Sequence, residues 1–139
     1  MSRELHIVNP AGLYDPSVNG YSHVAIAEDP ARLVFVAGQG AEDVHGTLAP
    51  DFEAQVRQAL GNLETALAAA GASFTDVAKL TVLVVDHDQA KHAVVAAELV
   101  RTWGDTPPPA CSLVPVPRLA LDGMLFEVDA TAVLRGARP

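Results

Sequence analysis

The stretch "DVAKLTVLVVD", residues 76–86, decides the fold of this chain. Between its charged ends it is almost continuously apolar and rich in β-branched residues, which favour strands. A run of this length and composition is typical of a strand that is buried on both faces. We therefore expect residues 76–86 to form a central strand of a sheet.

Helical patterns lie on both sides of this strand in the sequence. Over residues 51–70, apolar residues recur every three or four positions, which makes one apolar stripe along a helix (Phe52, Val56, Leu60, Leu63 and Leu67). Asp51 is a typical N-cap for this helix, and Gly71 stands where a left-handed terminator is expected. A second helix is predicted over residues 89–103, capped by Asp88 and ended by Gly104. Both helices are long enough to cover one face of a sheet.

Shorter β patterns complete the chain. Strands are predicted at residues 5–8, 21–28, 33–40, 110–116 and 124–134, and the second and third are expected to form one hairpin over residues 21–40. Helices and strands are therefore mixed, which predicts a single α+β domain over residues 1–139 with two helices on one face of a mixed sheet. Residues 124–134 alternate clearly, with Glu127 and Asp129 among apolar neighbours on the face turned away from Phe126 and Val128. A face of this mixed character often packs on another subunit.

Composition excludes several classes of partner. The chain has 139 residues and a formal charge of −8, without any run of Lys or Arg, so neither nucleic acid nor an anionic membrane surface is an expected partner. A single cysteine forms no internal disulfide, and the start "MSRELHIVNPAG" has no apolar signal core. No apolar run is long enough to span a membrane, so a cytoplasmic protein is expected.

The histidines do not form a metal-binding pattern. Neither H-x-x-H nor H-E-x-x-H occurs, and no metal is expected. Surface or helix-capping positions are predicted for each of the five (His6, His23, His45, His87 and His92).

Two carboxylates and one thiol are candidates for chemistry. Glu127 and Asp129 share one face of an otherwise apolar strand, and apolar surroundings raise a carboxyl pKa towards values useful for proton transfer. The alternative is that this face meets water or a neighbouring subunit. Cys111, in "PPPACSLVP" (107–115), is either a nucleophile, which requires a lowered pKa and a nearby base, or a small residue that packs at the start of a strand.

Four segments together resemble the RidA/YjgF family of reactive-intermediate deaminases. They are "GYSHV" (20–24), "FVAGQG" (35–40), "PACSLVPVPRL" (109–119) and "FEVDATAV" (126–133), and the similarity extends over residues 14–135. The resemblance implies a chorismate-mutase-like α+β fold, a homotrimer and three ligand clefts between subunits. It also implies hydrolysis of enamines and imines, such as 2-aminoacrylate, to a keto acid and ammonia without a metal or cofactor.

Position by position, the resemblance assigns candidate site residues. Tyr21 and Glu127 take catalytic positions, and the glutamate of active members is thought to position water. The resemblance implies ligand contacts from the backbone at Gly38 and from the strand start (Cys111, Ser112 and Leu113).

One position departs from the family pattern. Deaminating members typically read P-A-R-S where this chain reads Pro109-Ala110-Cys111-Ser112, so Cys111 replaces the arginine that grips the substrate carboxylate. A neutral thiol cannot replace the bidentate, charge-assisted bonds of a guanidinium. Ala37 also stands where a serine is common, and Arg118 lies too far along the chain to substitute for the arginine.

Three functions compete on these grounds. The first is hydrolysis of an imine or enamine that lacks a carboxylate. The second is a trimeric binding protein that captures a small, mostly neutral metabolite without chemistry. Ribonuclease activity, a label often given to the family, is disfavoured by the charge of −8 and the absence of basic clusters.

Overall fold

The elements follow the predicted order. The computed structural model describes residues 5–29 and 32–134. The helices are α1 (Phe52–Ala69) and α2 (Gln89–Trp103), with short 3-10 turns η1 (Ser17–Asn19) and η2 (Phe74–Asp76). The strands are β1 (Leu5–Val8), β2 (Val24–Ala27), β3 (Arg32–Gln39), β4 (Val77–Val85), β5 (Ala110–Val116) and β6 (Phe126–Leu134).

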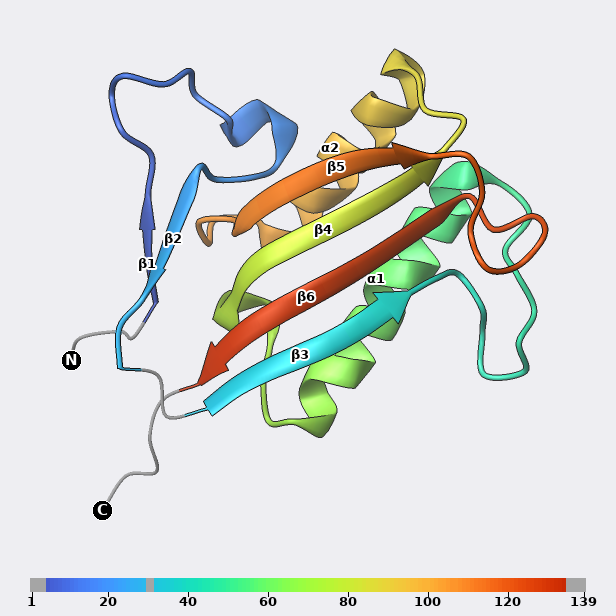
Figure 1. The fold of residues 1–139 in the computed structure, drawn as a ribbon, viewed down its shortest axis with the longest axis horizontal. Helices are drawn as coiled ribbons and strands as arrows, with labels where there is room; N and C mark the ends of the chain where they lie inside the picture. Colours follow the sequence, from blue (N-terminus) through green and yellow to red (C-terminus); the bar gives the residue numbers. More distant parts are fainter. Residues whose placement is uncertain (1–4, 30–31, 135–139) are drawn as a thin grey trace.

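The main sheet has four strands in the order β3-β6-β4-β5. Strands β4 and β5 are parallel, whereas β6 runs antiparallel to both of its neighbours, so the sheet is mixed. Both helices lie against the same face of this sheet, and β3 and β5 form its two edges (Figure 1). The predicted α+β class, with two helices on one face of a mixed sheet, is confirmed.

The core lies between the helices and the sheet. Alternate residues of β4 and β6 point towards the helices and are fully or almost fully buried (Leu80, Val82, Val84, Phe126, Val128, Ala130 and Ala132). The predicted stripe of α1 supplies Val56, Leu63 and Leu67, which are all inaccessible to solvent. Burial of a side chain of this size stabilises the fold by about 1.5–3 kcal/mol, so the stripe explains why α1 docks where it does.

The helix ends are set by the predicted caps. The carboxylates of Asp51 and Asp88 accept hydrogen bonds from the backbone N–H groups of Ala54 and Lys91. These bonds satisfy amide groups that have no partner inside the helix. Within the described ranges, no helix combines the length and the apolar character that crossing a membrane requires.

Strand β4 is buried on one face only, so the prediction of burial on both faces was wrong for the single chain. Leu80 and Val82 face the helices, whereas Thr81, Leu83 and Val85 are half-buried on the opposite face. No helix of the described residues covers that second face, which we call the open face of the sheet (Figure 1). The β4 residues on the open face include apolar ones such as Leu83 and Val85, and for this reason the sequence predicted burial on both faces.

The predicted hairpin over residues 21–40 was also wrong. Strand β2 pairs with β1 in a separate two-stranded sheet, and β3 pairs with β6, nearly a hundred positions further along the chain. Residue alternation identifies a strand but not its partner, and here the apolar β6 outcompetes the local neighbour. The strand expected from residue 21 begins only at Val24, because Ser22 instead forms an isolated bridge with Ala110.

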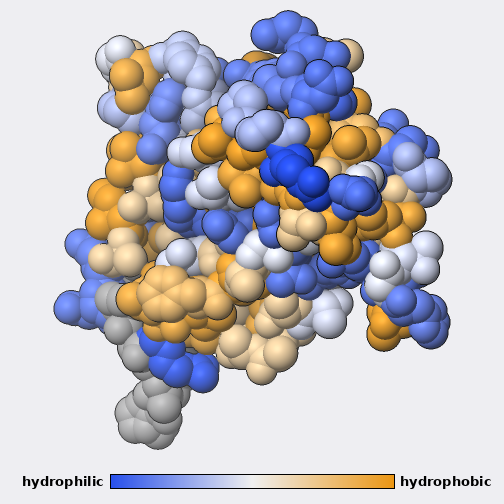
Figure 2. Space-filling view, turned by 45° about the vertical axis from the view of Figure 1, so that its right-hand side comes forward, coloured by the Kyte–Doolittle hydropathy of each residue, from blue (hydrophilic) through white to orange (hydrophobic). Residues whose placement is uncertain are grey.

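Several apolar side chains remain at the surface. Space-filling representation shows apolar residues exposed in patches on the face of Figure 2. On the edge strand β3, Phe35 keeps 74% of its surface exposed and Leu33 keeps 51%. Side chains of this kind on a sheet edge are candidates for contact with another chain.

Candidate functional site

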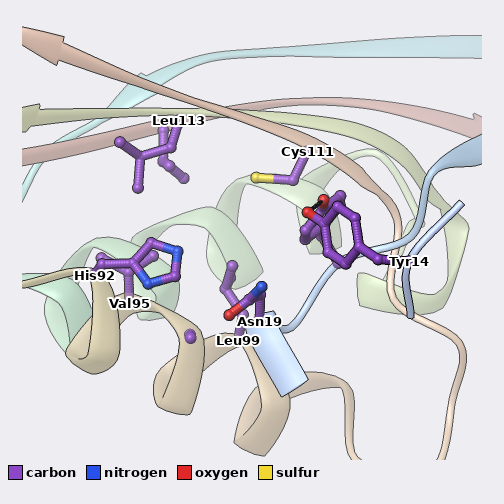
Figure 3. Close-up of a pocket in the computed structure, with 10 residues that line it drawn as sticks. Tyr14, Asn19, His92, Val95, Leu99, Cys111 and Leu113 are labelled. Carbon is purple, nitrogen blue, oxygen red and sulfur yellow. Dashed lines mark hydrogen bonds between the residues drawn. The ribbon is translucent and has the colours of Figure 1, made fainter. Parts of the chain in front are cut away.

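A pocket of about 210 Å³ opens between helix α2, the start of β5 and the loop that carries residues 14–21 (Figure 3). Its apolar wall comes from β4, α2 and β5 (Val82, Val95, Ala96, Leu99 and Leu113). Its polar groups come from the loop, from α2 and from the start of β5 (Tyr14, Asn19, Tyr21, His92 and Cys111). Three residues predicted for the site, Tyr21, Cys111 and Leu113, therefore share one pocket.

A glycine lets the loop approach the helix. Gly20 has a φ of +78°, and a Cβ atom there would lie 2.7 Å from Cβ of Leu99 and 2.9 Å from the carbonyl oxygen of Ala96. Only glycine combines this left-handed backbone with so close an approach. On its other side, the loop is tied to the start of β5 by the backbone N–H of Ser22, which donates to the carbonyl oxygen of Pro109 at 2.9 Å.

Aromatic side chains cluster at the end of the pocket that the loop at residues 14–21 forms. The rings of Tyr14, Tyr21 and His23 lie edge to face, with centroids 5.1–6.5 Å apart. Nε2 of His23 donates to the carbonyl oxygen of Tyr14 at 2.7 Å, and the two tyrosine hydroxyls hydrogen-bond to each other. This hydroxyl pair, together with burial, raises the pKa of Tyr21 to about 12. At neutral pH the Tyr21 hydroxyl is therefore protonated, and it acts as a hydrogen-bonding group rather than a base.

The thiol of Cys111 has the properties of a packing residue. Burial raises the pKa of Cys111 to about 11, and the nearby Lys79 offsets only part of that effect. Because the thiolate is the nucleophilic form, a thiol with this pKa is unreactive at neutral pH. The side chain also packs against the hydrophobic core. Of the two interpretations open from the sequence, the structure supports packing.

Glu127 and Gly38 lie together on the open face. A Cβ atom at Gly38 would stand 2.3 Å from Oε1 of Glu127, so the glycine leaves the space that this carboxylate occupies. Burial raises the pKa of Glu127, and the neighbouring Asp129 and Glu42 carboxylates add to the rise. The direction agrees with the prediction from the apolar surroundings of this strand. A carboxyl group with a raised pKa exchanges protons closer to neutral pH.

The sheet separates the predicted site residues into two groups. Alternation along β5 turns Cys111 and Leu113 towards the helices, whereas Ser112 pairs with Thr81 and accepts a hydrogen bond from Nζ of Lys79 at 2.7 Å. The pocket thus holds Tyr21, Cys111 and Leu113, and the open face holds the other three predicted residues (Gly38, Ser112 and Glu127). Within one chain the two groups do not form a single cavity.

The pocket contains no arginine or lysine from the part of the chain that the structure describes. Arg118, which lies beyond the end of β5, is paired with Asp122 at 2.9 Å. The Nζ atom of Lys91 donates to the carbonyl oxygens of Val85 and Asp86. Arg118 therefore does not line this pocket within one chain.

Three polar pocket residues were missed from the sequence: Tyr14, Asn19 and His92. His92 was expected at the surface or at a cap, but it lies in the first turns of α2 and lines the pocket. A signal existed, because His92 stands three and seven positions before Val95 and Leu99 and therefore shares their helix face. Tyr14 and Asn19 lie in a loop whose path no periodicity predicts.

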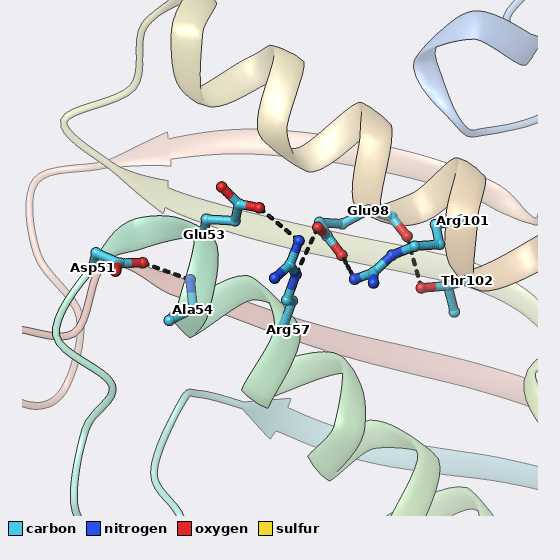
Figure 4. Close-up of polar contacts among 7 residues, drawn as sticks. All are labelled: Asp51, Glu53, Ala54, Arg57, Glu98, Arg101 and Thr102. Carbon is cyan, nitrogen blue, oxygen red and sulfur yellow. Dashed lines mark hydrogen bonds and ion pairs between the residues drawn. The ribbon is translucent and has the colours of Figure 1, made fainter.

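A second polar cluster joins the two helices away from the pocket (Figure 4). The carboxylate of Glu98, only 6% exposed, accepts from Nε of Arg57 at 3.0 Å and also pairs with Arg101. Arg57 is itself paired with Glu53 at 2.7 Å. Each charge in the cluster is matched within it, so the cluster fixes α1 against α2.

Comparison with known proteins gives consistent matches. A family model described as Endoribonuclease L-PSP matches residues 14–134. The 2-iminobutanoate/2-iminopropanoate deaminase of Salmonella typhimurium is 32% identical over 136 residues, which cover 97% of this chain and 100% of the relative. The RutC family protein YjgH of Escherichia coli is 35% identical, with 90% of this chain and 92% of the relative covered.

Solved structures show the same fold. YyfB of Yersinia pestis, a Rid family protein described as of unknown function, superposes with a TM-score of 0.90 at 34% identity, covering 95% of this chain and 100% of its own. Escherichia coli TdcF with bound serine gives a TM-score of 0.65 at 31% identity, covering 76% of this chain and 83% of its own.

Proposed function

Because the chain belongs to the RidA/YjgF family, which the Endoribonuclease L-PSP model describes, we propose that it hydrolyses a small imine or enamine that carries no carboxylate. The site is a cleft between subunits of a homotrimer. One subunit contributes the pocket beside Cys111, and its neighbour contributes Glu127 and the backbone at Gly38.

The division of the site residues supports a cleft between subunits. Tyr21 and Cys111 lie on the helix side of the sheet, whereas Gly38 and Glu127 lie on its open face. A packed sheet stands between the two groups, so both reach one ligand only if they come from different copies of the chain. The exposed Phe35 on β3 and the half-buried Leu83 on the open face supply apolar surface for such an assembly.

The observation that carries the choice of substrate is the uncharged pocket beside Cys111. The relatives from Salmonella typhimurium and Escherichia coli are described as acting on 2-iminobutanoate and 2-iminopropanoate, and both of these compounds contain a carboxylate. A carboxylate that enters a partly buried pocket loses hydration, and here no arginine or lysine of the described residues lines the pocket to compensate. An uncharged substrate avoids that loss.

Glu127 supplies the proton transfer that hydrolysis requires. Water adds to the carbon of the C=N bond while one of its protons passes to the Glu127 carboxylate, which delivers it to the nitrogen and leaves a carbinolamine. The hydroxyl proton of that carbinolamine then passes to the nitrogen by way of Glu127, and ammonia leaves as the C–N bond breaks and the C=O bond forms. The raised pKa of Glu127 makes it better suited than an ordinary glutamate to accept and return a proton in this reaction. The Tyr21 hydroxyl, which stays protonated, orients the substrate or the water by hydrogen bonding.

A matched pair of imine sources tests the proposal. An amine oxidase generates imines without a carboxylate, and an amino-acid oxidase generates 2-imino acids, while semicarbazide traps whatever imine remains. We expect the protein to lower the trapped amount with the amine-derived imines and to have little effect on 2-iminopropanoate. Glu127→Gln removes the effect, and His45→Ala, at an exposed loop position, retains it. Equal clearance by wild type and Glu127→Gln contradicts the catalytic role.

A non-catalytic binding protein is the second candidate. The neutral Cys111 thiol favours it, because this position provides neither the carboxylate-binding cation of the family nor a nucleophile. In that case a small neutral metabolite binds the purified trimer while no imine in the panel is cleared. Clearance of any imine above the Glu127→Gln background contradicts this second candidate.

A further inference from the structure

Two polar side chains point into the pocket without a partner among its residues. Figure 3 shows the imidazole of His92 and the carboxamide of Asn19 directed into the space beneath Cys111 and Leu113, with no hydrogen bond drawn from either side chain. His92 comes from α2 and Asn19 from η1, so the two groups converge from separate elements. Both residues are half-buried.

The surroundings of His92 make its position unusual. It shares a helix face with Val95 and Leu99, which are 3% and 2% exposed, and that face otherwise builds the core. A half-buried polar group without a hydrogen bond destabilises a protein unless something else satisfies it. Solvent water is able to satisfy such a group, and a bound ligand with a matching polar group is able to replace that water.

We propose that His92 and Asn19 are the specificity-determining residues of this pocket and that they hydrogen-bond the uncharged polar group of the ligand. This inference rests on the proposed function, because it assigns the substrate class of the same site. A neutral imidazole offers one donor and one acceptor, and a carboxamide offers both as well. The pair therefore recognises an amide, a hydroxyl or a carbonyl group.

The apolar wall and the volume of the pocket determine the shape and size of the rest of the ligand. Val95, Leu99 and Leu113 form an apolar surface, which fits an aliphatic or aromatic body. The pocket volume of about 210 Å³ is below the roughly 300–1,000 Å³ that is typical of sites for drug-sized ligands. The ligand class is a small, uncharged molecule with one apolar end and one amide, hydroxyl or carbonyl group.

Pyruvamide and pyruvate form the test pair, because they have nearly the same shape and differ in charge. Each is titrated by calorimetry into wild type, His92→Phe, His92→Gln and Asn19→Leu. His45→Ala is the control, since His45 is exposed and does not line the pocket. The imidazole signals of wild type are followed by NMR during the same titration, and the His92 signal is assigned by its loss in His92→Phe.

We expect pyruvamide to bind wild type and the His45→Ala control equally, and to shift the His92 signal. His92→Phe keeps the ring shape without the nitrogens and weakens binding about threefold to tenfold, the range expected for one neutral hydrogen bond. His92→Gln recovers most of that loss because it retains a donor and an acceptor. Asn19→Leu weakens binding to a similar degree.

Three results overturn the inference. One is the absence of pyruvamide binding to wild type, and another is unchanged affinity in His92→Phe. The third is that wild type binds pyruvate more tightly than pyruvamide, while His92→Phe binds the two equally. That result would mean that a protonated His92 imidazole binds a carboxylate. All three readouts measure binding, so a protein that binds as expected but clears no imine contradicts the enzymatic proposal and leaves this inference intact.

Discussion

The position of the Glu127 carboxylate depends on the absence of a side chain at Gly38. The carboxylate of Glu127 occupies the space that a side chain at Gly38 would fill. The backbone at Gly38 does not have a left-handed φ, so the reason for glycine there is space rather than conformation. The lack of a side chain at Gly38 therefore leaves the space in which the Glu127 carboxylate lies.

Gly38→Ala tests this relation. The added methyl group displaces the Glu127 carboxylate, whereas the backbone accommodates alanine without strain. We expect at least a tenfold loss of imine clearance, because a positioned acid or base contributes about 10²–10⁴ in rate. The unfolding free energy changes by less than about 1 kcal/mol, since alanine is favoured over glycine inside a strand by a similar amount. Unchanged clearance together with unchanged stability contradicts the proposed place of the carboxylate.

Glu127→Gln has a predicted pH signature in stability. The folded state raises the pKa of Glu127, so it holds this proton more tightly than the unfolded chain does. Stability from this residue is therefore fully present at low pH and is lost as pH rises through the folded-state pKa. Glutamine does not ionise, so thermal unfolding at pH 7 should show a higher Tm for Glu127→Gln than for wild type.

The same comparison at acid pH supplies the control. Below the ordinary glutamate pKa of about 4.3, Glu127 is protonated in both states and the Tm difference should vanish. A variant that is less stable than wild type at pH 7 contradicts the assigned direction of the pKa shift.

At the scale of elements, the pocket depends on the contact between the loop at residues 14–21 and helix α2. Gly20 provides that contact, because any side chain there collides with the backbone and Cβ atoms of α2. Such atoms cannot rotate away. The pocket wall formed by Tyr14 and Asn19 therefore exists only while residue 20 is glycine.

Gly20→Ala tests whether the pocket depends on this contact while the sheet stays folded. Overpacking costs about 1–3 kcal/mol, and a left-handed backbone costs alanine about 1–2 kcal/mol more. We expect a clearly lowered Tm and loss of pyruvamide affinity, while the four-stranded sheet remains folded by circular dichroism. Gly61→Ala, in α1, is the matched control, since a Cβ atom there meets nothing within 4 Å. Wild-type affinity in Gly20→Ala contradicts the role of this contact.

Local patterns predicted most elements but not their pairing. The helices were predicted with their caps because Asp51, Asp88 and the apolar stripes are all local signals. The pairing of β3 with β6 was missed because it depends on competition between distant strands. The sequence analysis made no prediction about which faces of the sheet Cys111 and Glu127 occupy, because that relation depends on how β5 and β6 are placed in one sheet. The family resemblance suggested a shared cleft, but it did not reveal His92 and Asn19, which lie outside the motifs.

At the scale of the whole molecule, apolar side chains such as Phe35 remain exposed, and the proposed site draws residues from two copies of the chain. We expect sedimentation at micromolar concentration to give three times the chain mass of 14.5 kDa. Phe35→Asp places a charge on the 74% exposed edge residue and should weaken the assembly, whereas Val44→Asp, on an exposed loop, is the control. A wild-type monomer at that concentration contradicts both the trimer and the shared cleft.

We propose that this site no longer binds a carboxylate, because Cys111 stands where the family has an arginine. Calorimetric titration of pyruvate into wild type and into Cys111→Arg tests this proposal. A charge-assisted hydrogen bond contributes about 1.5–3 kcal/mol, so the arginine should tighten pyruvate binding by roughly tenfold or more. We expect weak or undetectable pyruvate binding by wild type and measurable binding by Cys111→Arg. A wild-type affinity equal to or greater than that of Cys111→Arg contradicts the proposed loss of carboxylate binding.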